Sequence, residues 1–150
     1  MIMNPTAIKH VVVDGHSLTL ESFGAIARYN ATVELAPSAL EAMKKSRALA
    51  EKIAAEGRVA YGITTGFGEF QKVAVPKEMS NQLSTNLILS HCTAAGEPYA
   101  DEIVRGMMLL RANALCGGVS GVRPILVEML LEMLNKGVTP VCLLYTSPSP

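Results

Sequence analysis

The chain has 150 residues, of which 49% are hydrophobic and only 5% aromatic, and it contains no tryptophan. This length suits one domain with a real core, and a core built from Ala, Leu, Met and Val favours helix packed on helix over a β-sandwich. The 13 basic and 13 acidic residues cancel, and no cluster of Lys and Arg stands out, which argues against nucleic-acid binding.

The first third of the chain predicts one short β element and two helices. Residues 10–14 (HVVVD) form an apolar, β-branched run that is followed by a glycine, which predicts a strand. The segment ESFGAIARYN, at 21–30, predicts a short helix. A longer helix is predicted up to Gly57, because Ser38 and Glu41 have the spacing of a capping box at its start.

The next predicted helix runs from Pro76 to about residue 95. Leu83, Leu87 and His91 recur at four-residue spacing and share one face, so His91 is expected to point inward or into a pocket. On its own, a histidine at a helix end is equally well explained by its favourable interaction with the terminal carbonyls.

Two further helices are predicted, at residues 100–116 and 125–136. The first is apolar around nearly its whole circumference, which predicts neighbours on several sides. It also carries Arg111, and because a buried arginine needs a partner, an ion pair or a bond to a carbonyl is expected there. Two such helices in so short a chain indicate a piece of a larger helical bundle.

Other signals concern the compartment and the end of the chain. The three cysteines have no CxxC spacing and indicate a reducing compartment, with neither a disulfide framework nor a zinc site. No signal-peptide pattern and no apolar run of about 18 residues is found, so a cytoplasmic protein without a membrane span is expected. Residues 142–150 (CLLYTSPSP) have no core pattern and predict a disordered tail or residues foreign to the natural protein.

The segment with the strongest chemical signal is YGITTGFG, at residues 61–68. It lacks the Lys-Ser/Thr pair of a Walker loop, because Glu69 and Phe70 follow it. Gln71 stands where a dinucleotide-binding fingerprint needs its third glycine. Composition alone therefore leaves this segment a glycine-rich turn.

Three segments together resemble the N-terminal part of the aromatic amino-acid ammonia-lyases: YGITTGFG, LSTNLILSHCTAAGEP and RGMMLLRANALCGGVSGVRP. The resemblance runs from about residue 10 to Val141, and the Ser90-His91 pair favours the histidine branch over the phenylalanine branch. It implies a mainly α fold, the N-terminal part of a large helical-bundle lyase with a small β element. Residues 1–141 would be an incomplete lyase domain, and the full-length family forms homotetramers.

The resemblance also implies a reaction and roles for three residues. Family members eliminate ammonia from an α-amino acid without oxidation, and in the histidine branch the product is urocanate. They use no metal, but a methylidene-imidazolone group that forms autocatalytically from an Ala-Ser-Gly triplet. By the match of motifs, Tyr61 is the base that removes the β-proton, Gly68 lies against the substrate and His91 recognises the substrate side chain. A weakly acidic proton does need such a well-placed base.

One feature departs from the family pattern. The 150 residues contain no Ala-Ser-Gly triplet, which the resemblance places shortly after Val141, where CLLYTSPSP begins. We therefore expect an inactive fragment whose last residues, 142–150, are foreign to the family. Two alternatives stay open, namely a phenylalanine or tyrosine ammonia-lyase or aminomutase, and a non-catalytic helical interaction fragment.

Overall fold

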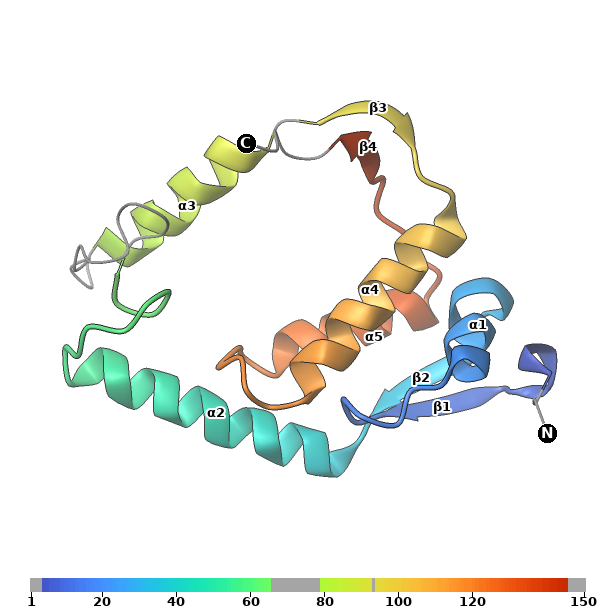
Figure 1. Cartoon of the computed structure of the whole chain (residues 1–150), viewed down its shortest axis with the longest axis horizontal. Helices are drawn as coiled ribbons and strands as arrows, with labels where there is room; N and C mark the ends of the chain where they lie inside the picture. Colours follow the sequence, from blue (N-terminus) through green and yellow to red (C-terminus); the bar gives the residue numbers. More distant parts are fainter. Residues whose placement is uncertain (1–3, 66–78, 93, 146–150) are drawn as a thin grey trace. The chain divides into compact units, whose positions relative to one another are not determined.

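The computed structural model describes residues 4–65, 79–92 and 94–145. The chain divides into two compact units, one made of residues 1–47 and 99–142 and the other of residues 48–98 and 143–150. Helices make up most of the regular structure in both units, which confirms the mainly α class (Figure 1). None of the helices in the described part of the chain combines the length and hydropathy that a bilayer crossing requires.

The first unit begins with a parallel β-α-β arrangement and continues with longer helices. Its elements in chain order are η1 (Pro5–Ala7), β1 (His10–Val13), α1 (Leu20–Tyr29), β2 (Thr32–Leu35), the start of α2 (Pro37–Ala55), α4 (Asp101–Cys116) and α5 (Ile125–Asn135). Strands β1 and β2 pair in parallel, with His10 opposite Thr32 and Val13 opposite Leu35. Parallel neighbours need a crossover connection, and α1 provides it.

The predicted strand and the helices at 21–30, 100–116 and 125–136 are confirmed, whereas β2 was not predicted. Its four residues alternate polar and apolar side chains, and Val33 alone among them is fully buried. This alternation was the sequence signal for a strand, although four residues are too few to distinguish a strand from a loop. The capping box predicted at Ser38 is wrong in register, because α2 already begins at Pro37. A capping box instead joins Thr19 to Ser22 at the start of α1.

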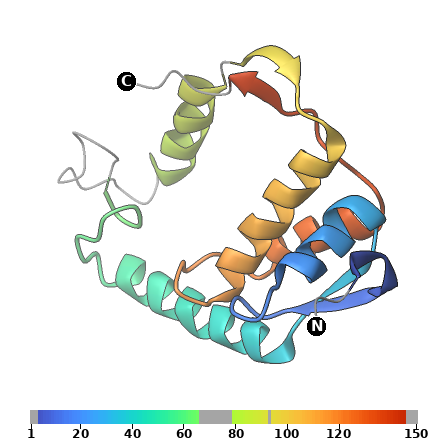
Figure 2. The same cartoon turned by 45° about the vertical axis from the view of Figure 1, so that its right-hand side comes forward.

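The hydrophobic core of this unit is assembled around α4. Figure 2 shows α1 and α5 lying against α4, and α5 also contacts β2. The largest fully buried side chains come from five elements, with two of them from α4: Val13, Ile26, Met43, Leu109, Cys116 and Val127. α4 has neighbours on two sides, α1 and α5, as its apolar circumference predicted, while its side chains Ile103 and Met107 are exposed.

The arginine buried in α4 is Arg105, and the prediction of a buried Arg111 is wrong. The guanidinium of Arg105 donates to the carbonyl oxygens of Ile26 at 2.9 Å, Leu134 at 3.1 Å and Ala27 at 3.3 Å. These carbonyls lie in the last turns of α1 and α5, where a helix cannot satisfy its own acceptors. Arg105 therefore joins the ends of two helices inside the core.

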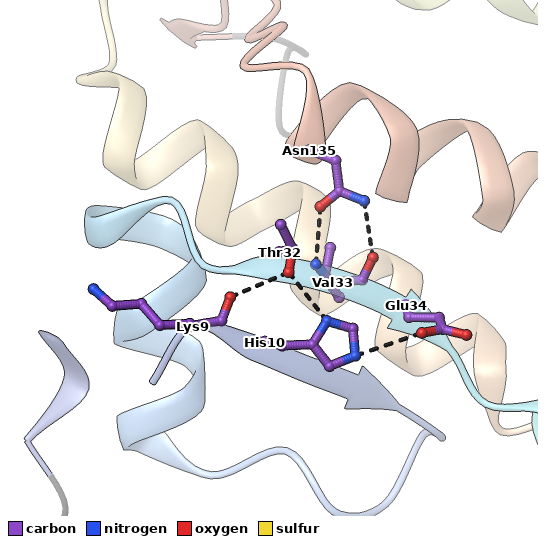
Figure 3. A network of polar contacts seen from close by, with 6 residues as sticks. All are labelled: Lys9, His10, Thr32, Val33, Glu34 and Asn135. Atoms are coloured by element: carbon purple, nitrogen blue, oxygen red, sulfur yellow. Dashed lines mark hydrogen bonds and ion pairs between the residues drawn. The ribbon is translucent and has the colours of Figure 1, made fainter. Parts of the chain in front are cut away.

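The outer edge of β2 is closed by a side chain instead of a strand. Figure 3 shows the amide of Asn135, at the end of α5, facing the backbone of Val33. Its Oδ1 accepts from the Val33 N–H at 2.8 Å, and its Nδ2 donates to the Val33 carbonyl at 2.9 Å. On the other side of the strand, the Thr32 hydroxyl donates to the Lys9 carbonyl at 3.1 Å. Asn135 thus imitates a neighbouring strand and ties α5 to the sheet.

Replacement of Asn135 by Ala is expected to lower the free energy of unfolding by about 1–3 kcal/mol, because both backbone groups of Val33 lose their partner. Asn135→Asp keeps the acceptor but not the donor, so it should lower the free energy of unfolding by no more than Asn135→Ala does. Urea titration followed by circular dichroism measures both. Lys136→Ala is the matched control, since Lys136 is exposed. An equal loss of unfolding free energy in that variant would show that the Asn135–Val33 hydrogen bonds do not stabilise the fold.

The second unit contains the rest of α2, helix α3 (Ser80–His91) and an antiparallel pair formed by β3 (Ala95–Pro98) and β4 (Leu143–Tyr145). The predicted start of a helix at Pro76 lies outside the described residues. Its predicted end near residue 95 is wrong, because β3 begins there. Strand β4 lies within the segment expected to be a tail, and residues 146–150 lie outside the described part.

Candidate active site

Two of the three predicted site residues can be placed. Tyr61 follows α2, and His91 is the last residue of α3, so both belong to the second unit. Gly68, predicted to lie against the substrate, falls outside the described residues.

Tyr61 occupies a hydrogen-bonded turn formed by residues 60–64. The Ala60 carbonyl accepts from the N–H groups of both Ile63 and Thr64, at 3.1 and 3.0 Å. Gly62, directly after Tyr61, has a φ of +73°, which a residue with a side chain rarely adopts. The tyrosine is 64% exposed on this turn.

Thr64 holds this turn closed with its side chain. Its hydroxyl accepts from the Ala60 N–H at 2.9 Å and donates to the Arg58 carbonyl. The sequence pattern included Thr64 in the glycine-rich motif but assigned it no role. A threonine three residues after the tyrosine, among glycines, was the signal for a side chain that closes the turn.

The side chain of His91 is anchored to the end of its own helix. Its Nδ1 lies 2.9 Å from the Leu87 carbonyl oxygen and 2.9 Å from the Ser90 hydroxyl, which itself donates to the Leu87 carbonyl at 2.9 Å. A carbonyl oxygen only accepts, so this approach requires the proton on Nδ1. In the neutral ring the lone pair is then on Nε2, which is the nitrogen left for a ligand.

Ser90 is the residue whose function the sequence did not reveal. It was noted for its place before His91, and the structure shows that its hydroxyl shares the Leu87 carbonyl with the ring. His91 is exposed, contrary to the expectation from its shared face with Leu83 and Leu87, which are half-buried. The hydrogen bonds of the His91 ring to Leu87 and Ser90 lie within its own helix.

No metal centre is found among the described residues, and the buried cysteine is a poor nucleophile. They include no group of three His, Cys, Asp or Glu side chains that could hold a metal ion. The thiol of Cys116 is buried in the core of the first unit, and this burial raises its pKa to about 11. A thiol with so high a pKa is mostly protonated near neutral pH and is a poor nucleophile. The placed part of the site offers the phenol of Tyr61, the imidazole of His91 and the exposed thiol of Cys92.

Comparison with known proteins places this geometry in a family. The family described as aromatic amino acid lyase matches residues 18–147. Histidine ammonia-lyase from Alkaliphilus metalliredigens is 47% identical over 134 residues, which cover 89% of this chain and 26% of that protein. The chain therefore spans about a quarter of the length of the curated relatives that it matches.

Solved structures agree with the sequence comparison. Ergothionase from Treponema denticola superposes with a TM-score of 0.86 at 30% identity, covering 92% of this chain and 28% of that one. Tyrosine aminomutase from Streptomyces globisporus superposes with a TM-score of 0.83 at 38% identity, covering 89% of this chain and 25% of that one. The fold, the motif around Tyr61 and the extent of the match lead to one conclusion: the chain belongs to the aromatic amino acid lyase family.

Proposed function

We propose that this chain is part of a histidine ammonia-lyase, which eliminates ammonia from histidine to give urocanate. The observation that carries the proposal is the 47% identity over 134 residues to the histidine ammonia-lyase of Alkaliphilus metalliredigens. Because the chain spans about a quarter of that protein, the activity belongs to the complete enzyme that contains this segment. We expect that enzyme to be a cytoplasmic homotetramer that acts on a small-molecule substrate.

Each site residue has a chemical role in this proposal. Tyr61 is the base that accepts the β-proton of the substrate, and it lies exposed on the turn at 60–64. His91 binds the substrate side chain through Nε2, since its Nδ1 proton is directed at the Leu87 carbonyl. Gly68 lies against the substrate, where the missing side chain allows close approach.

The residues present do not fit the family's electrophile. Methylidene-imidazolone forms from an Ala-Ser-Gly triplet, and no such triplet occurs in the 150 residues. Tyr61 and His91 can therefore bind and accept a proton, but this chain does not itself supply the group that activates the substrate.

A polypeptide of these 150 residues is accordingly expected to produce no urocanate from histidine. Residues 10–141, exchanged for the equivalent stretch of the Alkaliphilus metalliredigens enzyme, should give a chimeric lyase that does. Urocanate absorbance measures both, and the unmodified enzyme is the positive control. Clear turnover by the 150-residue polypeptide would contradict the missing electrophile. A folded chimera that leaves histidine unchanged would contradict the assignment to the histidine branch.

A tyrosine aminomutase is the second candidate, favoured by the 38% identity to the Streptomyces globisporus structure. Histidine, tyrosine and phenylalanine offered to the chimeric lyase separate the two, because the segment contributes His91. In the proposed function, His91→Leu should raise KM for histidine. If it leaves KM and turnover of histidine intact, His91 does not recognise the substrate; a chimera that converts tyrosine and leaves histidine unchanged would favour the aminomutase.

We further propose that residues 1–141 are part of the lyase domain and that residues 142–150 are foreign to it. The coding DNA beyond the codon for Val141 tests this division. An Ala-Ser-Gly triplet in a reading frame that replaces CLLYTSPSP would support it. A family sequence that continues through CLLYTSPSP would overturn it.

A further inference from the structure

Three polar atoms meet at the end of α3, and each pair of them is 2.9 Å apart. They are Nδ1 of His91, the hydroxyl oxygen of Ser90 and the carbonyl oxygen of Leu87. The imidazole and the hydroxyl can each donate one proton to this triangle, whereas the carbonyl can only accept. The positions of the two protons are therefore restricted.

The Ser90 hydroxyl donates its proton to the Leu87 carbonyl. Its oxygen keeps its lone pairs, and Nδ1 of His91 lies at hydrogen-bond distance from it. Nδ1 thus faces two acceptors, one from Leu87 and one from Ser90. The neutral ring with its proton on Nε2 would instead direct the Nδ1 lone pair at the carbonyl oxygen, which repels it. The serine therefore adds a second acceptor that favours the Nδ1–H form.

Hydrogen bonds, and not burial, hold this ring. Ser90 and His91 are both exposed, and within the described residues both hydrogen bonds of the ring are made by Nδ1 in the last turn of its own helix. A side chain that binds a ligand must be held in one orientation, and hydrogen bonds to its neighbours supply that restraint. Loss of the Ser90 hydroxyl would leave one bond, about which the ring turns more freely.

We propose that Ser90 is a positioning residue of the lyase site, which keeps the proton of His91 on Nδ1 so that Nε2 accepts a hydrogen bond from the substrate side chain. This inference rests on the proposed function, in which His91 binds the substrate, and it deepens that function by stating the substrate class. The side chain of the substrate must carry an N–H or O–H donor. The imidazole of histidine provides one, and the phenyl ring of phenylalanine does not.

The donor requirement has a physical reason. An acceptor that is shielded from water and left without a donor costs free energy, so a site built around one rejects analogues that lack the donor. A His91 ring with its proton on Nε2 would itself donate and would favour substrates that accept. A hydroxyl group that does not touch the substrate thus controls which side chains bind.

The first unit contains a second histidine with a hydroxyl group at Nδ1, and it provides the control. Nδ1 of His10 lies 3.0 Å from the hydroxyl oxygen of Thr32, which donates to the Lys9 carbonyl at 3.1 Å (Figure 3). Nε2 of His10 lies 3.5 Å from Oε2 of Glu34. Thr32→Ala therefore removes a hydroxyl group from a histidine outside the unit that contains His91.

NMR spectroscopy of the 150-residue chain tests the position of the proton. Long-range correlations between ring protons and ring nitrogens distinguish the Nδ1–H from the Nε2–H form at alkaline pH, where imidazole is neutral. We expect His91 mainly in the Nδ1–H form. Ser90→Ala should lower the ratio of Nδ1–H to Nε2–H about fivefold, the worth of one hydrogen bond. Ser90→Thr brings back the hydroxyl and should restore most of the ratio, and Thr32→Ala should leave it unchanged.

Circular dichroism verifies that the variants fold, which is expected because Ser90 is exposed and alanine favours helices. An unmodified chain with the His91 proton mainly on Nε2 overturns the proposal. A ratio that Ser90→Ala leaves unchanged, or that Thr32→Ala lowers equally, overturns it too.

Steady-state kinetics of the chimeric lyase test the donor requirement. Ser90→Ala should raise KM for histidine about fivefold and change kcat little, because the hydrogen bond to the side chain is present before and during the reaction. Ser90→Thr should recover most of the loss, and Thr32→Ala should have no effect. A KM that Ser90→Ala leaves unchanged overturns the positioning role. Phenylalanine converted with the same kcat/KM as histidine overturns the donor requirement.

The two experiments separate this inference from the proposed function. A chimera that converts tyrosine but not histidine contradicts the histidine assignment, and KM for tyrosine then replaces KM for histidine, since a phenol O–H is also a donor. The ratio of the two ring forms in the 150-residue chain does not depend on any activity. It upholds or overturns the role of Ser90 whichever substrate the complete enzyme takes.

Discussion

Tyr61→Phe in the chimeric lyase is expected to lower kcat for urocanate formation by about 10²–10⁴-fold, the usual contribution of a positioned base. The substitution removes the phenol oxygen and keeps the ring, so substrate binding and KM should change little. Ala60 and Thr64 hold the turn through backbone groups and the threonine hydroxyl, which the substitution does not touch. Steady-state kinetics on histidine would show whether the loss lies in kcat.

The matched control is Tyr29→Phe. Tyr29 ends α1 in the first unit and is 53% exposed, close to the exposure of Tyr61, so the same chemical change is made in the unit that does not contain Tyr61 and His91. Its kcat should equal that of the unmodified chimera. If Tyr61→Phe also leaves kcat unchanged, Tyr61 is not the base, although the family assignment would stand.

Arg105→Met should have the largest effect on stability, a loss of about 3–5 kcal/mol in the free energy of unfolding. Methionine replaces the aliphatic stem but none of the donors, so the carbonyls of Ile26, Ala27 and Leu134 each lose the bond from the guanidinium in a buried site, although the Leu134 carbonyl still accepts from the Gly137 N–H. Burial lowers the pKa of the guanidinium, yet arginine stays charged in proteins, so the three bonds keep their charge-assisted strength.

The control for this prediction is Arg111→Met on the exposed face of the same helix. Its effect should stay within about 0.5 kcal/mol, as for other surface substitutions. Arg105→Lys should fall between the two, since one ammonium group cannot reach three carbonyls as the planar guanidinium does. Urea midpoints, compared at constant m-value, give the change in unfolding free energy for Arg105→Met, Arg105→Lys and Arg111→Met. Equal losses at positions 105 and 111 would show that Arg105 does not hold the helix ends together.

The secondary structure was predictable wherever a local pattern was long enough. β1, α1, α4 and α5 lie where periodicity and composition predicted them, because each carries its own pattern of apolar residues. β2 was missed because its four residues gain their stability from pairing with β1 and from Asn135, and neither partner is near in sequence. The end of α3 was misjudged because pairing with β4 extends the chain from residue 95.

The face that each helix presents was less predictable than the helix itself. α4 is apolar on nearly all sides, so periodicity could not decide which arginine is buried. The packing of α1 and α5 decided it, since Arg105 shares a face with Leu109 and Ala112, whereas Arg111 shares one with Met107. The same packing left a row of apolar side chains on α4 exposed, namely Ile103, Met107 and Leu110.

By itself, the sequence determined the family, the mainly helical class and the identity of Tyr61 and His91 as candidate site residues, because motifs and apolar periods are properties of neighbouring residues. Only the tertiary structure decided how those residues are held. The turn that presents Tyr61 depends on the Thr64 hydroxyl, and the proton on His91 depends on a carbonyl one helical turn away. The partners of Arg105 and the exposed row on α4 arise from contacts between elements far apart in the chain, which no local pattern encodes.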